Sequence, residues 1–443
     1  MYEDLTAAVD ADFPAAMRSL EDLVRIPSVS APGGDPAQVR RSAEAAAALV
    51  AAAGADDARL LELDGAPPAV FATAAGPPGA PVVLLYAHHD VQPPGPDAEW
   101  DTPPFEPEVR AGRLHGRGAA DDKAGIALHA AVLRVFAGTP PVTLKLFFEG
   151  EEEVGSDHLP AFLDAYAGDL AADVIVIADS GNFATGVPAL TTSLRGLVDC
   201  VVEVRTLESA VHSGGFGGVV PDALTALAHI VATLHDDTGA VAVSGLVRTE
   251  TDLDLDETEF RAVAGVADGV ELIGSGSIPS RLWFQPAISV LAIDAPRVDD
   301  AINQLVPAAR AKISMRLAPG DDPQRALDAL VSHLQAAAPW GAAVSVERGA
   351  TGDAFALSTN GGAYDAFREG FTRAYGSETV EVGQGGSIPF VAAFQDRYPE
   401  ASILLTGVAD PQCGAHAPNE SVALADFRAG ILGEAIALRL LGA

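Results

Sequence analysis

Imidazole and carboxylate side chains follow the ends of several short apolar segments of this chain. They are His88, Asp90, Asp121, Glu152, Glu153, Asp179 and His416. Two imidazoles and several carboxylates without a cysteine form a donor set suited to divalent cations such as zinc or manganese. A single histidine or aspartate after a strand is usually a helix cap or a satisfied polar group. The prediction of a metal site therefore depends on all of these residues meeting at one place.

The segment His88-His89-Asp90 divides its side chains between two faces. In extended backbone, residues i and i+2 share a face, so His88 and Asp90 point together and His89 points away. A metal-bound imidazole is commonly held by a carboxylate that fixes its tautomer, and Asp90 suits that role. We expect His89 to be an ordinary core or surface histidine.

A run of acidic residues, Glu149-Gly150-Glu151-Glu152-Glu153, directly follows an apolar segment. Such a run is usually a solvated loop, but charges placed directly after a buried strand are costly unless cations compensate them. Adjacent glutamates can divide the work, because one can bind a cation while its neighbour accepts a proton from the attacking water.

Asp121-Asp122-Lys123 follows a turn-rich stretch that contains Gly116 and Gly118. The spacing resembles a dinucleotide-binding fingerprint, but its third glycine is missing, which makes a nicotinamide-linked dehydrogenase a weak alternative. A carboxylate at the start of a helix is the simpler interpretation. Asp121 could there bridge two cations while Asp122 supports the backbone.

Apolar runs before these residues predict buried strands, each ending abruptly in polar residues. The predicted strands are Val82–Ala87, Val142–Phe148, Asp173–Ala178 and Ser402–Gly407, and the helical segments are 13–25, 36–53, Ile126–Phe136 and Tyr364–Tyr375. This alternation predicts an α/β fold whose mostly parallel sheet is covered by helices on both faces. Ligands bind beyond the carboxyl ends of such strands, where the acidic residues and histidines stand.

The middle of the chain, residues 199–349, has a different pattern. Strand-like and helical stretches there are Cys200–Arg205, Ala287–Ile293, Ala311–Leu317, Ala343–Glu347, Asp222–Leu234 and Pro323–Ala338. They predict an α+β sandwich inserted into the first domain, which is then formed by residues 1–198 and 350–443. The acidic segment Glu250–Glu259 is expected to be an exposed turn or short helix.

Composition excludes several classes of function. The formal net charge of −34 repels nucleic acids and anionic membranes, so neither is an expected partner. No apolar run is long enough to span a membrane, and the acidic N-terminal segment lacks the pattern of a signal peptide, which favours the cytoplasm. The two cysteines, Cys200 and Cys413, are too few for a disulfide framework or a cysteine-rich zinc site. We expect Cys413 to be a small buried residue, although it precedes His416 by three positions.

Several motifs together resemble the metallopeptidase family that contains carnosine dipeptidases, cytosolic non-specific dipeptidase, glutamate carboxypeptidase, aminoacylase and acetylornithine deacetylase. In chain order the motifs are HHDVQPP, GRGAADDKAG, EGEEEVGS, VHSGGFGG, GGSIP and CGAHAPNE. They cover essentially the whole chain, and DVQP, EGxEExGS and GGSIP are most similar to the dipeptidase branch. Ala87 and Ala124 stand where the family usually has glycine, which affects local packing more than chemistry.

The resemblance implies a role for each matching residue of the first domain. One metal would be held by His88 and Asp179, the other by Glu153 and His416, with Asp121 bridging them. Glu152 matches the general base and Asp90 the residue that orients His88, whereas Glu151 has no assigned role. The family often has a cis peptide bond after the bridging aspartate. The cations implied are two divalent ions, most simply Zn²⁺, with Mn²⁺ and Co²⁺ also compatible with these ligands.

The resemblance also makes the inserted segment 199–349 a lid and dimerisation domain of a homodimer. His212 matches a histidine that reaches across the dimer to stabilise the tetrahedral oxyanion. Arg316 matches the arginine that clamps the substrate carboxylate. Asn303 and Ser387 match polar contacts to the substrate.

The expected activity is hydrolysis of dipeptides or similar small amides that carry a free carboxylate. A deacylase of N-acyl amino acids from the same family is the nearest alternative. Asp179 favours the peptidase, because the resemblance links aspartate there with peptidases and glutamate with many deacylases. A non-catalytic amino-acid or peptide-binding protein is a more remote alternative, since every matched catalytic position is intact.

Overall fold

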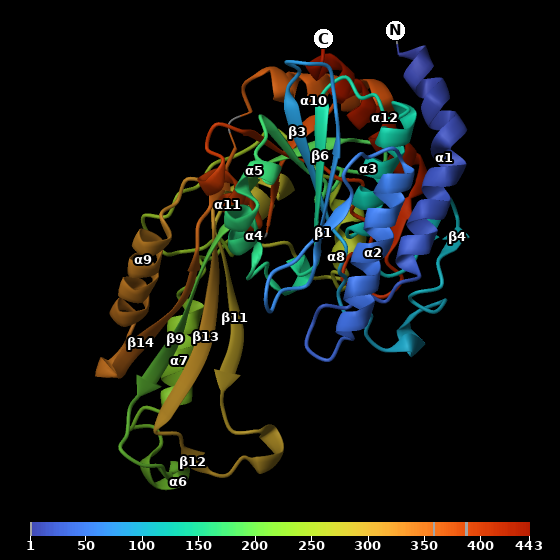
Figure 1. The fold of residues 1–443 in the computed structure, drawn as a ribbon. Coiled ribbons are helices and arrows are strands. Elements are labelled where there is room, and N and C mark those ends of the chain that lie inside the picture. The colour runs from blue at the N-terminus through green and yellow to red at the C-terminus, as the bar shows by residue number, and fades with distance from the viewer. Residues whose placement is uncertain (1, 358, 386–388) are drawn as a thin grey trace. The chain divides into compact units, whose positions relative to one another are not determined.

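The computed structural model describes residues 2–357, 359–385 and 389–443 (Figure 1). The chain forms two compact units. The first comprises the described residues of 1–192, 357–382 and 389–443, and the second those of 193–356 and 383–388. Ser387, predicted to contact the substrate, lies outside the described residues. The predicted domain boundaries at 198/199 and 349/350 stay a prediction.

The first unit is built on a twisted mixed sheet. Its strand order is β1 (Arg59–Leu61), β2 (Ala69–Ala74), β6 (Thr143–Glu149), β3 (Val82–His88), β7 (Val174–Ile177), β17 (Ser402–Leu405) and β8 (Ala189–Leu194). The neighbours β6–β3, β3–β7 and β7–β17 are parallel, whereas β1–β2, β2–β6 and β17–β8 are antiparallel. From Val83 to His88 every residue of β3 is buried, as expected for a central parallel strand covered on both faces.

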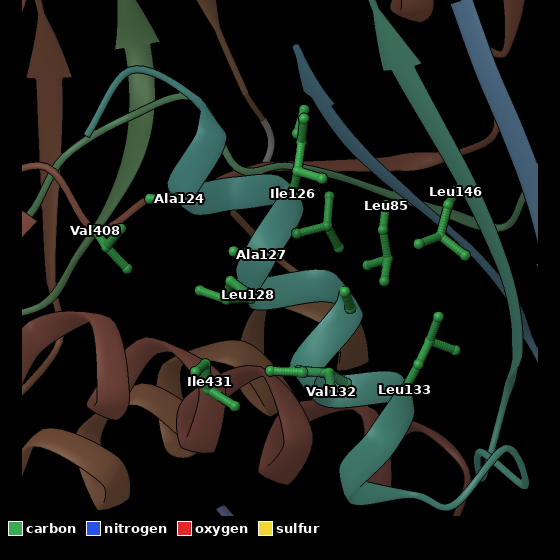
Figure 2. Close-up of a cluster of buried hydrophobic side chains, with 14 of the residues drawn as sticks. Leu85, Ala124, Ile126, Ala127, Leu128, Val132, Leu133, Leu146, Val408 and Ile431 are labelled. Carbon is green, nitrogen blue, oxygen red and sulfur yellow. The ribbon is translucent and has the colours of Figure 1, made fainter. Parts of the chain in front are cut away.

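Helices cover this sheet on both faces. They are α1 (Glu3–Val24), α2 (Pro36–Ala52), α3 (Lys123–Val135), α4 (Leu159–Ala165), α5 (Ala167–Leu170), α10 (Gly362–Tyr375), α11 (Pro389–Arg397) and α12 (Leu424–Leu441). On one face α3 packs against β3 and α12, and Figure 2 shows Leu128, Val132 and Ile431 in that core. On the other face Tyr86 of β3 stacks on Phe390 of α11, with ring centroids 5.0 Å apart. The sheet is thus the middle of three layers.

The second unit contains a four-stranded antiparallel sheet that shares its core with the helices α7 (Ala223–Ala232) and α9 (Pro323–Ala336). The strand order is β11 (Ala287–Asp294), β13 (Ala308–Leu317), β9 (Gly196–Arg205) and β14 (Ala343–Gly352). Burial alternates along β9, which directs Val198, Cys200 and Val202 into a core shared with both helices. This is the predicted α+β unit.

Shorter elements complete both units. They are β4 (Glu108–Arg110), β5 (Arg113–His115), β10 (Val211–His212), α6 (Ser213–Phe216), α8 (Glu257–Ala264), β12 (Gln304–Leu305), β15 (Phe355–Ala356), β16 (Val380–Gln384) and β18 (Ser421–Ala423). Antiparallel pairing joins β18, β5 and β4. Among the described residues, no helix combines the length and apolar content needed to cross a membrane.

The fold class predicted from the sequence is confirmed, with local differences. Helix α1 begins at Glu3, ten residues before the predicted start. Pro14 lies inside it, and the buried residues Leu5, Val9 and Ala16 follow one helical face through that proline. Asp173, predicted as the first residue of this strand, directly precedes β7, and its carboxylate accepts a hydrogen bond from Val82 N at the start of β3.

Candidate metal centre

Parallel neighbours in the first sheet bring the acidic segments to one edge. β3 ends at His88, β7 ends two residues before Asp179, and β6 ends at Glu149, after which a 3-10 turn, η2 (Glu152–Val154), begins. Asp121 lies just before α3. Because the carboxyl ends of parallel strands meet at one edge, these side chains converge there.

One group of side chains surrounds His88. Its Nε2 atom lies 3.0 Å from Asp121 Oδ1, 3.8 Å from Asp179 Oδ1 and 4.0 Å from Glu152 Oε2. One ligand atom from each of His88, Glu152 and Asp179 lies within 4.8 Å of the others, a spacing that could hold a cation.

A second group includes His416, which follows β17 along the chain. Its Nε2 atom lies 3.0 Å from Asp121 Oδ2 and 3.1 Å from Glu153 Oε2. Asp121 thus directs one carboxylate oxygen toward each imidazole. All five residues expected to bind metal therefore lie together in the first unit.

Further contacts fix the orientation of these side chains. His88 Nδ1 donates to the backbone carbonyl of Asp90 at 3.2 Å and lies 3.3 Å from Asp90 Oδ1. Asp90 Oδ2 accepts hydrogen bonds from Ser30 Oγ (2.6 Å) and Glu153 N (3.1 Å). Gln92 donates from its backbone N to Glu153 Oε1 (3.1 Å) and from Nε2 to Glu153 Oε2 (2.9 Å). Asp90 and Gln92 therefore hold His88 and Glu153 in place.

His89 has different surroundings. It is buried, and its Nε2 donates to the carbonyl of Pro68 at 2.9 Å. Burial lowers the pKa of His89 to about 4, so this imidazole is neutral near pH 7.

The electrostatics of this edge favour added positive charge. Burial, together with Glu153 and Asp121, raises the pKa of Glu152 to about 7. Burial and the neighbouring Asp121 and Glu152 raise the pKa of Asp179 well above its usual range. Hydrogen bonds to Asp121 and Glu153 raise the pKa of His416 to about 10. Besides burial, the excess of carboxylates over imidazoles contributes to all three shifts, and divalent cations would relieve the repulsion among those carboxylates. The oxygen and nitrogen donors present fit two such ions.

Comparison with known proteins decides the family. The description "Peptidase family M20/M25/M40" matches residues 84–435. The chain belongs to this family. A cysteinylglycine-S-conjugate dipeptidase of Corynebacterium striatum is 39% identical to this M20 peptidase over 352 residues, covering 77% of each chain. A Beta-Ala-His dipeptidase of Rattus norvegicus is 27% identical over 378 residues, covering 80% of this chain and 76% of the relative. The resemblance predicted from the motifs is confirmed.

Solved structures share the fold of this M20 peptidase. Human carnosine dipeptidase 1 has a TM-score of 0.78 at 23% identity, covering 99% of this chain and 98% of that one. A Bacillus subtilis protein described as a dinuclear metal binding peptidase from the M20 family has a TM-score of 0.61 at 14% identity, covering 97% and 98%. The peptide bond between Asp121 and Asp122 of the present chain is cis, as the resemblance implied.

The other predicted site residues of this M20 peptidase belong to the second unit. His212 ends β10, and its exposed imidazole accepts a hydrogen bond at Nδ1 from Gly214 N (3.1 Å). Asn303 directly precedes β12, which pairs with β10, and its carbonyl accepts from Ser213 N. Arg316 lies half-buried in β13 between β11 and β9. His212 and Asn303 are therefore brought close to each other.

The sequence did not predict a role for Gln92 or Ser30, although the contacts of both residues support the candidate metal centre. Gln92 belongs to the DVQP motif, but a glutamine is a weak signal without a known partner. Ser30 lies in an irregular segment before α2, and no periodic pattern points to it. Both act through hydrogen bonds to residues about 60 positions away in the sequence, and sequence patterns do not specify such bonds.

Proposed function

We propose that this M20 peptidase is a dipeptidase that uses two divalent cations to hydrolyse the amide bond next to a free carboxylate. One cation would be held by His88 and Asp179 and the other by Glu153 and His416. Asp121 would bridge them. The observation that carries the proposal is the Asp121 carboxylate, whose two oxygens lie 3.0 Å from two different imidazoles. Zinc suits these ligands best, and manganese and cobalt also fit.

Residues of the first unit supply the proton chemistry. When bound, the cations polarise the substrate carbonyl and lower the pKa of the attacking water. Glu152 takes the proton of that water and returns it to the leaving amine. Its carboxylate lies 4.0 Å from His88 Nε2, farther than the 3.0 Å that separates Asp121 Oδ1 from the same atom. Asp90 engages His88 Nδ1, through its backbone carbonyl at 3.2 Å and its carboxylate at 3.3 Å, and so leaves the lone pair of His88 Nε2 free to bind a cation.

Residues of the second unit recognise the substrate in this proposal. Arg316 binds the free carboxylate of the dipeptide through its planar guanidinium. His212 stabilises the oxyanion, and Asn303 and Ser387 contact the substrate. The named activities of the relatives, which act on cysteinylglycine conjugates and on Beta-Ala-His, support a small peptide with two free ends.

We expect hydrolysis of Ala-Ala to depend wholly on metal. Treatment with a chelator should abolish turnover, and added Zn²⁺ should restore it, because the carboxylates of the centre cannot polarise a carbonyl themselves. N-acetylalanine should be cleaved with a kcat/KM at least about tenfold lower, a difference of about 1.4 kcal/mol in transition-state binding. A preference for N-acetylalanine would instead identify a deacylase. Full activity in metal-free protein would refute the proposal.

The proposed assembly is a homodimer formed through the second unit. β11 is an edge strand of the four-stranded sheet, and its Val290, Leu291 and Ile293 are exposed. An edge strand with apolar side chains is a template for pairing with a second chain. In such a dimer His212 of one subunit would serve the other subunit. The cytoplasmic location expected from the sequence stays a prediction.

Replacing Leu291 by Lys should convert the dimer into a monomer and lower kcat, because a buried, unpaired charge at the edge strand opposes pairing. Analytical ultracentrifugation and dipeptide turnover measure the two effects. The matched control is Val263→Lys on α8, since Val263 is 54% exposed and Leu291 59%. A fully active monomer would show that His212 does not act between subunits.

A further inference from the structure

A buried ion pair lies next to the candidate metal centre without being one of its ligands. Arg117 Nη1 donates to Glu420 Oε2 at 2.6 Å, and the two side chains are 1% and 0% exposed. Buried ion pairs contribute little net stability relative to apolar side chains of similar size, because desolvation offsets their attraction. The contacts of this pair suggest a more specific role than stability.

The other hydrogen bonds that the Glu420 carboxylate accepts come from the turn that carries Asp121. Its Oε2 also accepts from Gly118 N at 2.9 Å, and its Oε1 accepts from Ala120 N at 2.9 Å and Asp121 N at 3.1 Å. Each oxygen thus accepts two hydrogen bonds, which fills the capacity of an ionised carboxylate. The backbone of Asp121 is fixed by this carboxylate.

Arg117 connects the same turn with two other segments. Its Nη2 donates to the carbonyl of Ala417 at 3.3 Å and to that of Pro93 at 3.4 Å. Ala417 directly follows His416, and Pro93 lies shortly after Asp90 along the chain. In addition, Gly116 N donates to the carbonyl of Glu420 at 2.9 Å. Three ligand-bearing segments that are far apart in sequence therefore meet at one ion pair.

We propose that the Arg117–Glu420 pair is a positioning device that sets the separation of Asp121 and His416 and thereby creates the second cation site. The proposal rests on the proposed two-cation function. Neither residue touches the substrate or a cation, so both act through the ligands that they hold. The first site depends on the pair less, because His88 and Asp179 are positioned by β3 and β7 of the central sheet.

The isosteric variant Glu420→Gln tests this role. Whichever way the amide is turned, its NH2 group replaces an oxygen that accepts two hydrogen bonds, so a donor faces donors. Titration of metal-free protein with zinc chloride, followed calorimetrically, should show one equivalent bound as in the wild type. The second equivalent should bind about 10–100-fold more weakly, the usual effect of losing an outer contact to a metal ligand.

The matched control is Glu434→Gln on α12. Glu434 is also buried (1% exposed) and hydrogen-bonds to a histidine, His129 Nδ1, at 2.9 Å. His129 lies within α3 and not in the turn that carries Asp121 or the segment that carries His416. This variant should bind both zinc equivalents with wild-type affinity, although loss of the buried contact to His129 should lower its melting temperature. Equal weakening of zinc binding in both variants would overturn the proposal, because burial alone would then explain the effect.

Arg117→Lys provides an independent test should Glu420→Gln fail to fold. Lysine keeps the charge for Glu420 but cannot also bond the carbonyls of Ala417 and Pro93. It should weaken the second zinc equivalent while leaving the first unchanged. Wild-type zinc affinity in either folded variant would overturn the proposal. A wild-type protein that binds two zinc equivalents but cleaves no dipeptide would refute the proposed function and leave the positioning role standing.

Discussion

Replacing Glu152 by Gln should reduce dipeptide turnover by about 10²–10⁴-fold while both cations remain bound. Glutamine has nearly the same shape as glutamate but cannot accept the proton of the attacking water. The expected ligands of the two cations are unchanged in this variant. Turnover of Ala-Ala, together with metal content by elemental analysis, measures both parts of the expectation.

Glu151→Gln is the matched control for this variant. Glu151 adjoins Glu152 in the sequence, but its carboxylate turns to His158, accepting from His158 N at 2.6 Å. This variant should keep most of its turnover and both cations. If Glu152→Gln retained wild-type turnover, or lost a cation together with its activity, Glu152 would not be the general base.

Asp121→Ala should release both cations and with them nearly all turnover. Its carboxylate is shared, since one oxygen lies near His88 and the other near His416. Loss of metal polarisation removes several kcal/mol of transition-state stabilisation, so kcat should fall by at least about 10³-fold. Zinc stoichiometry after gel filtration, measured beside turnover, is the direct readout.

Asp179 and Glu153 each lie near a single imidazole of the centre. Variants at these two positions therefore distinguish the loss of a bridging ligand from the loss of one negative charge. Asp179→Ala and Glu153→Ala should each lose one zinc equivalent and keep the other, because each carboxylate lies near a different histidine. Each removes the same single charge as Asp121→Ala. An Asp121→Ala protein that still holds two zinc equivalents would show that the aspartate does not bridge them.

Apolar patterning was sufficient to predict the strands that position the first cation site. β3, predicted as Val82–Ala87, extends to His88, and β6 and β7 differ from their predictions by one residue at each end. Continuous burial on both faces of a parallel strand gives an uninterrupted apolar run, which is a strong signal. From the strand ends, the convergence of His88, Asp121 and Asp179 at one edge could be expected.

The proposed second cation site, at Glu153 and His416, could not be predicted from apolar patterning. His416 has a left-handed backbone conformation, with φ of 64°, in an irregular segment that carries no periodic signal. Only the resemblance to a known family connected it with Glu153. The contacts of Gln92 and Glu420 are directed at backbone groups and loop residues far away in sequence, and residue type does not encode such partners. For the same reason the motifs GRGAADDKAG and CGAHAPNE, which contain Arg117 and Glu420, did not predict a role for this pair.

The shared carboxylate of Asp121 has a consequence for protein synthesis. The ribosome adds His416 only after it has made the entire second unit and residues 357–382 of the first unit. Until then one oxygen of Asp121 has no imidazole opposite it, and β17 has not yet filled its place between β7 and β8. A partly translated polypeptide that lacks His416 therefore lacks one imidazole of the proposed centre, so peptide hydrolysis is expected to begin only after His416 has been added and β17 has joined the sheet.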